Sequence, residues 1–164
     1  CYNPNQHNPN ITWDMRGRII IDIISFLQKN NYKRIALKIK DGSSDQLFYE
    51  QILNIYGQKN NVSLLTGPSS KYIGSSEIAI GQFSTALFEF TYGEIPYYIY
   101  EPYENGKTDA MIDSSIIFNR QSISRNIKEL EVNIHNNKPS VIADYDQMYD
   151  GTELSKINYN QLIN

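Results

Sequence analysis

The sequence has little of several features that mark other classes of protein. Its 164 residues include one cysteine, Cys1, so no disulfide can form within the chain. No apolar run approaches the roughly 20 residues that a membrane-spanning helix needs. The net charge of −3 provides no basic field for nucleic acid. We therefore expect a cytoplasmic protein that binds no nucleic acid.

Motifs for metals and common cofactors are also absent. The chain has no Gly-x-Gly-x-x-Gly and no Walker loop, and its two histidines, His7 and His135, are isolated from each other. The stretch DYDQMYDG, residues 144–151, lacks the spacing of a calcium loop. No Ser-His-Asp set can be recognised. We expect neither a metal site nor a cofactor.

What is present is an ordinary globular composition, with 40% hydrophobic and 20% charged residues. A chain of this length can bury one core. We find no internal repeat and no low-complexity linker. The sequence therefore predicts a single domain over residues 1–164. Because the chain does not begin with Met, we also expect it to be a fragment of a longer, two-domain protein.

Short apolar strands alternate with amphipathic helices along the chain. Strand patterns occur at 34–39, 62–65, 77–80, 95–100 and 114–118. Helical periodicity occurs between them at 13–28, 44–56, 85–92 and 123–134. Alternation with short connections predicts an open parallel sheet covered by helices on both faces, a Rossmann-like α/β fold.

Local signals define the ends of these helices. Thr12 is the expected N-cap of the first helix, Ser43 with Gln46 forms a capping box for the second, and Ser84 is the expected N-cap of the third. Gly57 and Gly93 are expected to end the second and third helices. In the second helix the spacing predicts an inner face made of Phe48, Ile52 and Tyr56.

Open α/β sheets bind ligands at the carboxyl ends of their strands, where helix N-termini favour phosphates. Three loops at such positions, 40–44, 66–75 and 81–85, carry Ser, Thr or Gly. In the last loop Gly81 would let a ligand approach the backbone, and Ser84 and Thr85 add hydroxyl groups. Glu89 could accept hydrogen bonds from a ribose diol. The alternative is a capped helix whose Glu89 faces solvent.

The stretch YIGSSEIAIGQFSTALFEFTYGEIPYYIY, residues 72–100, resembles the C-terminal half of GT-B glycosyltransferases. The likeness is to bacterial surface-polysaccharide, capsular and teichoic-acid-type transferases. It consists of a strand, a Gly-x-x-Ser-Thr turn, a helix with an acidic residue, and a glycine and proline before the next strand. The matching positions are Gly81, Ser84, Thr85, Glu89, Gly93 and Pro96. With the segment 33–65, which resembles the family's Lys-x-His-Pro strand and following helix, the likeness covers roughly residues 30–135.

The resemblance implies that the chain binds a nucleotide-activated sugar or a polyol phosphate. Ser84 and Thr85 would then meet the phosphates and Glu89 the ribose, beside a turn made by Gly81 and Gln82. Where the family has His-Pro after the strand lysine, this chain has Lys40-Asp41. The residues left to contact phosphate there are Lys38, Lys40 and Ser43.

The resemblance also implies where the catalytic base lies. In GT-B enzymes the base belongs to the N-terminal domain, so this chain alone is not expected to turn over substrate. No metal is required, and the full-length protein would allow peripheral association with a membrane. The alternative function is a non-catalytic Rossmann-like module that binds a nucleotide or a partner protein.

Overall fold

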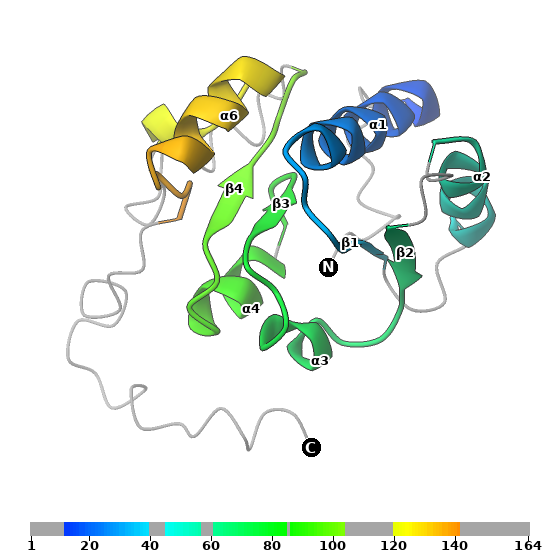
Figure 1. Ribbon diagram of the computed structural model, residues 1–164, viewed down its shortest axis with the longest axis horizontal. Coiled ribbons are helices and arrows are strands. Elements are labelled where there is room, and N and C mark those ends of the chain that lie inside the picture. Colours follow the sequence, from blue (N-terminus) through cyan, green and yellow to red (C-terminus); the bar gives the residue numbers. More distant parts are fainter. Residues whose placement is uncertain (1–11, 40–44, 57–60, 85, 104–119, 142–164) are drawn as a thin grey trace.

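A computed structural model describes residues 12–39, 45–56, 61–84, 86–103 and 120–141 (Figure 1). These residues form a mixed α/β structure with short parallel strand pairs. The strands are β1 (Ile35–Lys38), β2 (Val62–Leu65), β3 (Ala79–Gly81) and β4 (Tyr97–Ile99). The helices are α1 (Trp13–Lys29), α2 (Gln46–Tyr56), α3 (Ser70–Ile73), α4 (Ala86–Tyr92), the short 3-10 helix η2 (Arg120–Ser122) and α6 (Ile127–His135). None of the described helices is long and apolar enough to span a bilayer.

The strands form two parallel pairs. β1 pairs with β2 from Ile35 opposite Val62 to Lys38 opposite Leu65. β3 pairs with β4 from Ala79 opposite Tyr97 to Gly81 opposite Ile99. A helix lies between the strands of each pair in the sequence, α2 in the first and α4 in the second, as parallel pairing requires. Strands are confirmed near all four predicted positions, and β2 matches 62–65 throughout. β1 and β4 are shorter than the predicted 34–39 and 95–100, and β3 lies at 79–81 instead of 77–80. The predicted strand at 114–118 lies outside the described residues.

The pair β3–β4 is covered by helices on both faces. Tyr98 and Tyr100 point to one face and pack with Ile19 and Phe26 of α1 and with Leu130 of α6. On the other face a second cluster surrounds the fully buried Leu87 of α4, with Ala79, Tyr97, Ile99, Ile123 and Val141. Alternation of side chains along β4 thus divides the core into two halves. Figure 1 shows α1 and α6 on one side of these strands and α4 on the other.

The first helix confirms its predicted cap, while the second corrects part of its predicted inner face. The Thr12 side chain accepts a hydrogen bond from the N–H of Met15 at 3.3 Å. In α2, Ile52 is buried, but Tyr56 is 49% exposed, so the prediction for Tyr56 is wrong. The reason is that α1 covers α2 where Gly17 lies close to Phe48 and Ile52, one turn before the end of the helix. The capping Ser43 and the predicted stop, Gly57, lie outside the described residues.

An ion pair also joins the first two helices. The Arg16 guanidinium of α1 lies 3.9 Å from the carboxylate of Asp45, the residue before α2, and both side chains are buried. The guanidinium also lies 4.9 Å from the centre of the Trp13 ring. Asp45 directly follows the loop 40–44, so this contact fixes the point at which the chain enters α2.

The helix α4 ends where the sequence predicts, but it begins one residue later than predicted. Its first residue is Ala86, so Ser84 does not directly precede the helix as predicted, and Thr85 lies outside the described residues. The helix ends at Tyr92 as predicted, but the left-handed residue there is Glu94, with φ 59°. Gly93 is needed for another reason, since a Cβ at this position would overlap the side chain of Ile73 in α3.

The last helix begins later than predicted. Ile123 and Ser124 are not helical but run alongside β4, where Ser124 forms a parallel bridge with Tyr100. The helix α6 starts after Asn126, whose side chain accepts from the N–H of Glu129 at 3.0 Å. The Glu129 carboxylate in turn accepts from the N–H of Arg125, the residue before the N-cap, at 2.6 Å, so the two bonds are reciprocal as in a capping box but reach one residue further back. This Asn-x-x-Glu spacing is visible in the sequence.

A methyl group at Gly93 should destabilise the fold. Overlap with the Ile73 side chain is expected to lower the free energy of unfolding by about 1–3 kcal/mol in Gly93→Ala, measured by urea denaturation. Gly74→Ala is the matched control, because a Cβ there meets no atom within 4 Å and the φ of Gly74 is −63°. Truncation of the neighbour, Ile73→Ala, should reduce the cost of Gly93→Ala. Equal stability of the two glycine variants would contradict this account.

Candidate functional site

The candidate site lies at the carboxyl ends of β3 and β4, where the turn 82–84 leads from β3 toward α4. A buried carboxylate underlies this turn. Glu101, two residues beyond β4, is 2% exposed. One carboxylate oxygen accepts from the N–H of Phe83 at 2.9 Å, and the other accepts from the Gln82 side-chain amide at 3.1 Å. The turn after β3 is therefore held directly by the residue that follows β4.

A buried phenol holds the same turn from the other side. The Tyr97 hydroxyl donates to the carbonyl of Gln82 at 3.0 Å. Burial raises the pKa of Tyr97, the Glu101 carboxylate adds to this rise, and a hydrogen bond from the Ser84 side chain opposes it. A Cβ at Gly81 would overlap the Tyr97 hydroxyl. The lack of a side chain at Gly81 thus makes room for the phenol, a packing role that the sequence did not indicate.

A cation stands at the same edge of the sheet. The Arg125 guanidinium donates to the carbonyl of Glu101 at 3.2 Å. The N–H of Glu101 donates to the carbonyl of Ser124 at 2.9 Å, so the segment 124–125 extends the edge next to β4. Sequence reasoning missed Glu101, Tyr97 and Arg125. The available signal was a carboxylate directly after an apolar strand, in YIYE at residues 98–101.

Three of the residues predicted for the site come together, and a fourth lies on the adjacent helix. Gly81, Gln82 and Ser84 share the turn at the end of β3. Glu89 is half-buried in the first turn of α4. It stands about 200° around the helix from the fully buried Leu87 and so on the face turned away from the sheet. No hydrogen bond or ion pair joins its carboxylate to another described residue.

The predicted residues after β1 are placed only in part. Lys38 is the last residue of β1, and its ammonium group donates to the carbonyl of the next residue, Ile39. Lys40 and Ser43 lie outside the described residues, as does Thr85.

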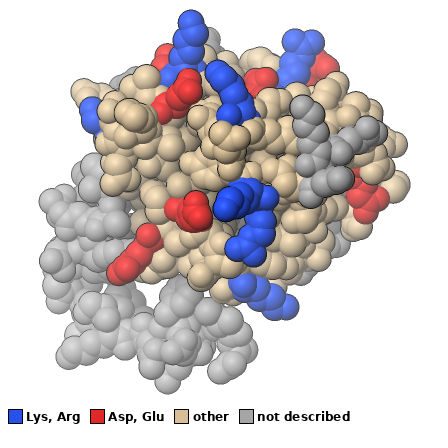
Figure 2. Space-filling view, viewed as in Figure 1, with Lys and Arg blue, Asp and Glu red and all other residues tan. Residues whose placement is uncertain are grey.

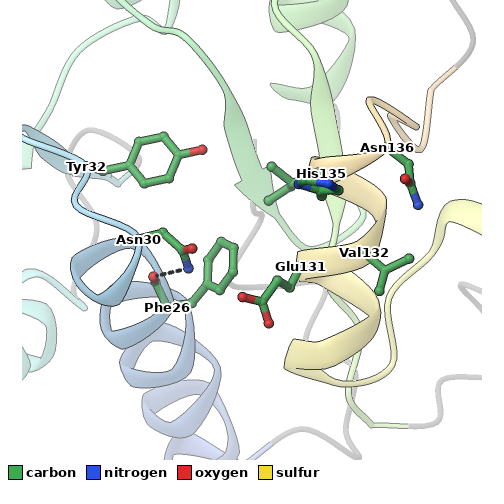
Figure 3. Close-up of a pocket in the computed structure, with 8 residues that line it drawn as sticks. Phe26, Asn30, Tyr32, Glu131, Val132, His135 and Asn136 are labelled. Atoms are coloured by element: carbon green, nitrogen blue, oxygen red, sulfur yellow. Dashed lines mark hydrogen bonds between the residues drawn. The ribbon is translucent and has the colours of Figure 1, made fainter.

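A shallow groove lies elsewhere on the molecule, between the C-terminal ends of α1 and α6 (Figure 3). Its volume is about 530 Å³ and its lining residues are Phe26, Asn30, Tyr32, Glu131, Val132, Ile134, His135 and Asn136. Tyr32 precedes β1, and Asn61, whose side chain donates to its carbonyl at 2.8 Å, precedes β2. The groove is thus at the amino ends of these strands, away from the predicted loops. Most of its lining side chains are exposed.

Within the described part of the chain, neither surface charge nor clustered metal ligands mark the turn 82–84 or the groove as a binding site. Among the described residues, no three His, Cys, Asp or Glu side chains are grouped so that they could hold a metal ion. On the face shown in Figure 2, Lys and Arg side chains are scattered among Asp and Glu over a mostly uncharged surface. The geometry of the turn 82–84 is therefore the main structural guide to function.

Comparisons with protein-family models, with curated proteins and with solved structures gave no match for this chain.

The close contact of Gly81 with Tyr97 predicts a specific coupling between them. Gly81→Ala is expected to lower the free energy of unfolding by about 1–3 kcal/mol, because the new methyl group overlaps the phenol hydroxyl. Tyr97→Phe alone should cost about 1 kcal/mol, since the Gln82 carbonyl loses this donor. In the double variant the cost of the added methyl group should fall by about 1 kcal/mol or more. Strictly additive costs in urea denaturation would contradict the contact.

Proposed function

We propose that this chain is the donor-binding half of a GT-B glycosyltransferase that acts in the synthesis of a bacterial surface polysaccharide. Its ligand would be a nucleotide-activated sugar or a polyol phosphate. The observation that carries the proposal is the turn between β3 and α4, in which Gly81, Gln82 and Ser84 stand at the carboxyl edge of a parallel strand pair. Of these, Gly81 and Ser84 are positions at which the sequence resembles that family.

The arrangement of the helices supports a Rossmann-like sheet. α1 contacts α2 and α6, while α3 contacts α4. α1 and α6 pack on one face of β3–β4 and α4 on the other (Figure 1). The helix that follows β1 is thus associated with one face and the helix that follows β3 with the opposite face. In doubly wound sheets the winding changes in this way between the two central strands.

Residues at the amino ends of β1 and β3 lie near each other. Tyr32 precedes β1, and Glu77 precedes β3. Burial raises the pKa of the Tyr32 phenol, and the nearby Glu77 carboxylate raises this pKa further. The pKa of Tyr98 in β4 is raised by burial and also by the neighbouring Tyr32. The hydrogen-bonded strands form two separate pairs, β1–β2 and β3–β4, and the order β2-β1-β3-β4, with the change of winding between β1 and β3, is part of this proposal. Ligands of such folds bind where the winding changes, which here is between the loops 40–44 and 81–85.

Within this scheme each described residue has a chemical role. The Ser84 hydroxyl would donate to a phosphate oxygen in place of the Tyr97 phenol, and the Gln82 backbone would fix the approach to the turn. The Glu89 carboxylate, half-buried and without a described partner, would accept from the two ribose hydroxyls. Release of the leaving nucleotide would depend on such hydrogen bonds rather than on a metal. The base that activates the acceptor is assigned to an N-terminal domain outside this sequence.

A non-catalytic nucleotide-binding module is the second candidate. The sequence favours it, because Lys40-Asp41 stands where the family has its phosphate-contacting His-Pro. Such a module would bind a nucleotide without transferring its sugar. An α/β domain encoded upstream in the full gene would favour the enzyme, and its absence would favour the module.

Nucleotide binding should be visible as thermal stabilisation. We would record melting curves with CMP, CDP, UDP, GDP and their sugar derivatives. At 100 times the dissociation constant, one of them should add about 2.7 kcal/mol to the free energy of unfolding. The shift should vanish in Glu89→Ala, whose ribose contact is lost, and persist in the control Glu94→Ala, an exposed acid just beyond the other end of α4. No shift with any nucleotide at millimolar concentration, or an equal shift in both variants, would count against the proposed site.

A further inference from the structure

The carboxylate of Glu101 is an unusual group to bury. Carboxylates are rarely fully buried unless hydrogen bonds or counter-charges compensate the lost hydration. Glu101 is 2% exposed, and its two oxygens accept from Phe83 and Gln82. Charge-assisted hydrogen bonds of this kind are shorter and stronger than neutral ones. These two partners are consecutive residues of one turn, so the carboxylate acts on the shape of that turn.

The turn has a second support, the phenol of Tyr97. The Tyr97 hydroxyl donates to the carbonyl of Gln82, while Glu101 accepts from the side chain of Gln82 and from the next N–H. The main chain of the turn is therefore held at two successive polar groups. Ser84, the next residue, carries the hydroxyl assigned above to phosphate. A change in the direction of the turn would move this hydroxyl.

We propose that Glu101 is a positioning residue for the nucleotide site, an inference that rests on the function proposed above. It touches no ligand itself, since its carboxylate is buried. Its negative charge fixes the conformation of residues 82–84, with Tyr97 as the second support. The expected consequence is that removal of the charge weakens nucleotide binding even where the protein stays folded.

The test is an exchange of the two facing side chains. In Gln82→Glu two carboxylates face each other and the amide donor is lost, so the turn should loosen. In Glu101→Gln the amide oxygen can still accept from the N–H of Phe83, and a 180° flip of the Gln82 amide would keep a hydrogen bond between residues 82 and 101. Both bonds then lack the negative charge that strengthens them. The double variant places one carboxylate and one amide together again. Glu94→Gln, at an exposed position beyond α4, is the matched control for charge.

Two measurements distinguish an effect on the conformation of the turn from an effect on nucleotide binding. Native-state hydrogen exchange of the Phe83 amide, recorded by NMR, reports the turn. The amide of Ile99, bound to the Ser140 hydroxyl at 2.8 Å, reports the rest of the fold. We expect the Phe83 amide to exchange about tenfold faster in Glu101→Gln and in Gln82→Glu, with Ile99 unchanged. The double variant should exchange more slowly than Gln82→Glu. The nucleotide dissociation constant should follow the same order across the variants.

The outcomes distinguish the two proposals. Unchanged Phe83 exchange in Glu101→Gln would overturn the positioning role whatever the ligand. Faster exchange with an unchanged nucleotide dissociation constant would also overturn it and leave the proposed function standing. A wild-type protein that binds none of the nucleotides would overturn the proposed function. The exchange data would then still decide whether Glu101 fixes the turn.

Discussion

The described structure depends on β4, a strand that is buried on both faces and along both edges. Its residues Tyr97, Tyr98 and Ile99 are at most 5% exposed. A backbone in this position needs a partner for each N–H and C=O. β3 provides the partners on one edge, through pairs such as Ala79 with Tyr97. On the other edge Ser124 and Ser140 act in place of a neighbouring strand, since Ser124 donates to the carbonyl of Ile99 and the Ser140 hydroxyl accepts from its N–H.

That second edge explains the burial of the polar side chains of Ser124, Asn133 and Ser140. The Asn133 amide in α6 donates to the carbonyl of Ser122 and to the hydroxyl of Ser124, both at 3.1 Å. The Ser140 hydroxyl also donates to the carbonyl of Ser122 at 2.8 Å. In a low-dielectric interior such bonds are strong, and leaving any of these groups unpaired would be costly. The network therefore specifies how α6 and the chain before it lie against β4.

The sequence predicted the parts of the fold that depend on local pattern. Apolar strands between amphipathic helices, and the cap at Thr12, follow from spacing and side-chain chemistry within a few residues. It did not predict that Ile123 and Ser124 would be extended, because their apolar spacing continues that of α6 and only the open edge of β4 draws them out of the helix. Tyr56 was misplaced for a similar reason. Its spacing fits the inner face, but α1 does not cover the last turn of α2.

The candidate site divides in the same way, into residues that meet solvent and residues that support them. Ser84 and Glu89 could be proposed from the sequence because a hydroxyl and a carboxylate at the start of an apolar helix fit either a helix cap or a ligand contact. Tyr97 and Gly81 have the pattern of an ordinary strand and turn, and their contact appears only when β3 and β4 are paired. Glu101 lies between these two groups of residues, because the sequence shows its charge but only the fold shows that it is buried. A carboxylate that follows a buried strand can therefore hold in place the turn before a neighbouring helix, as Glu101 does for residues 82 and 83.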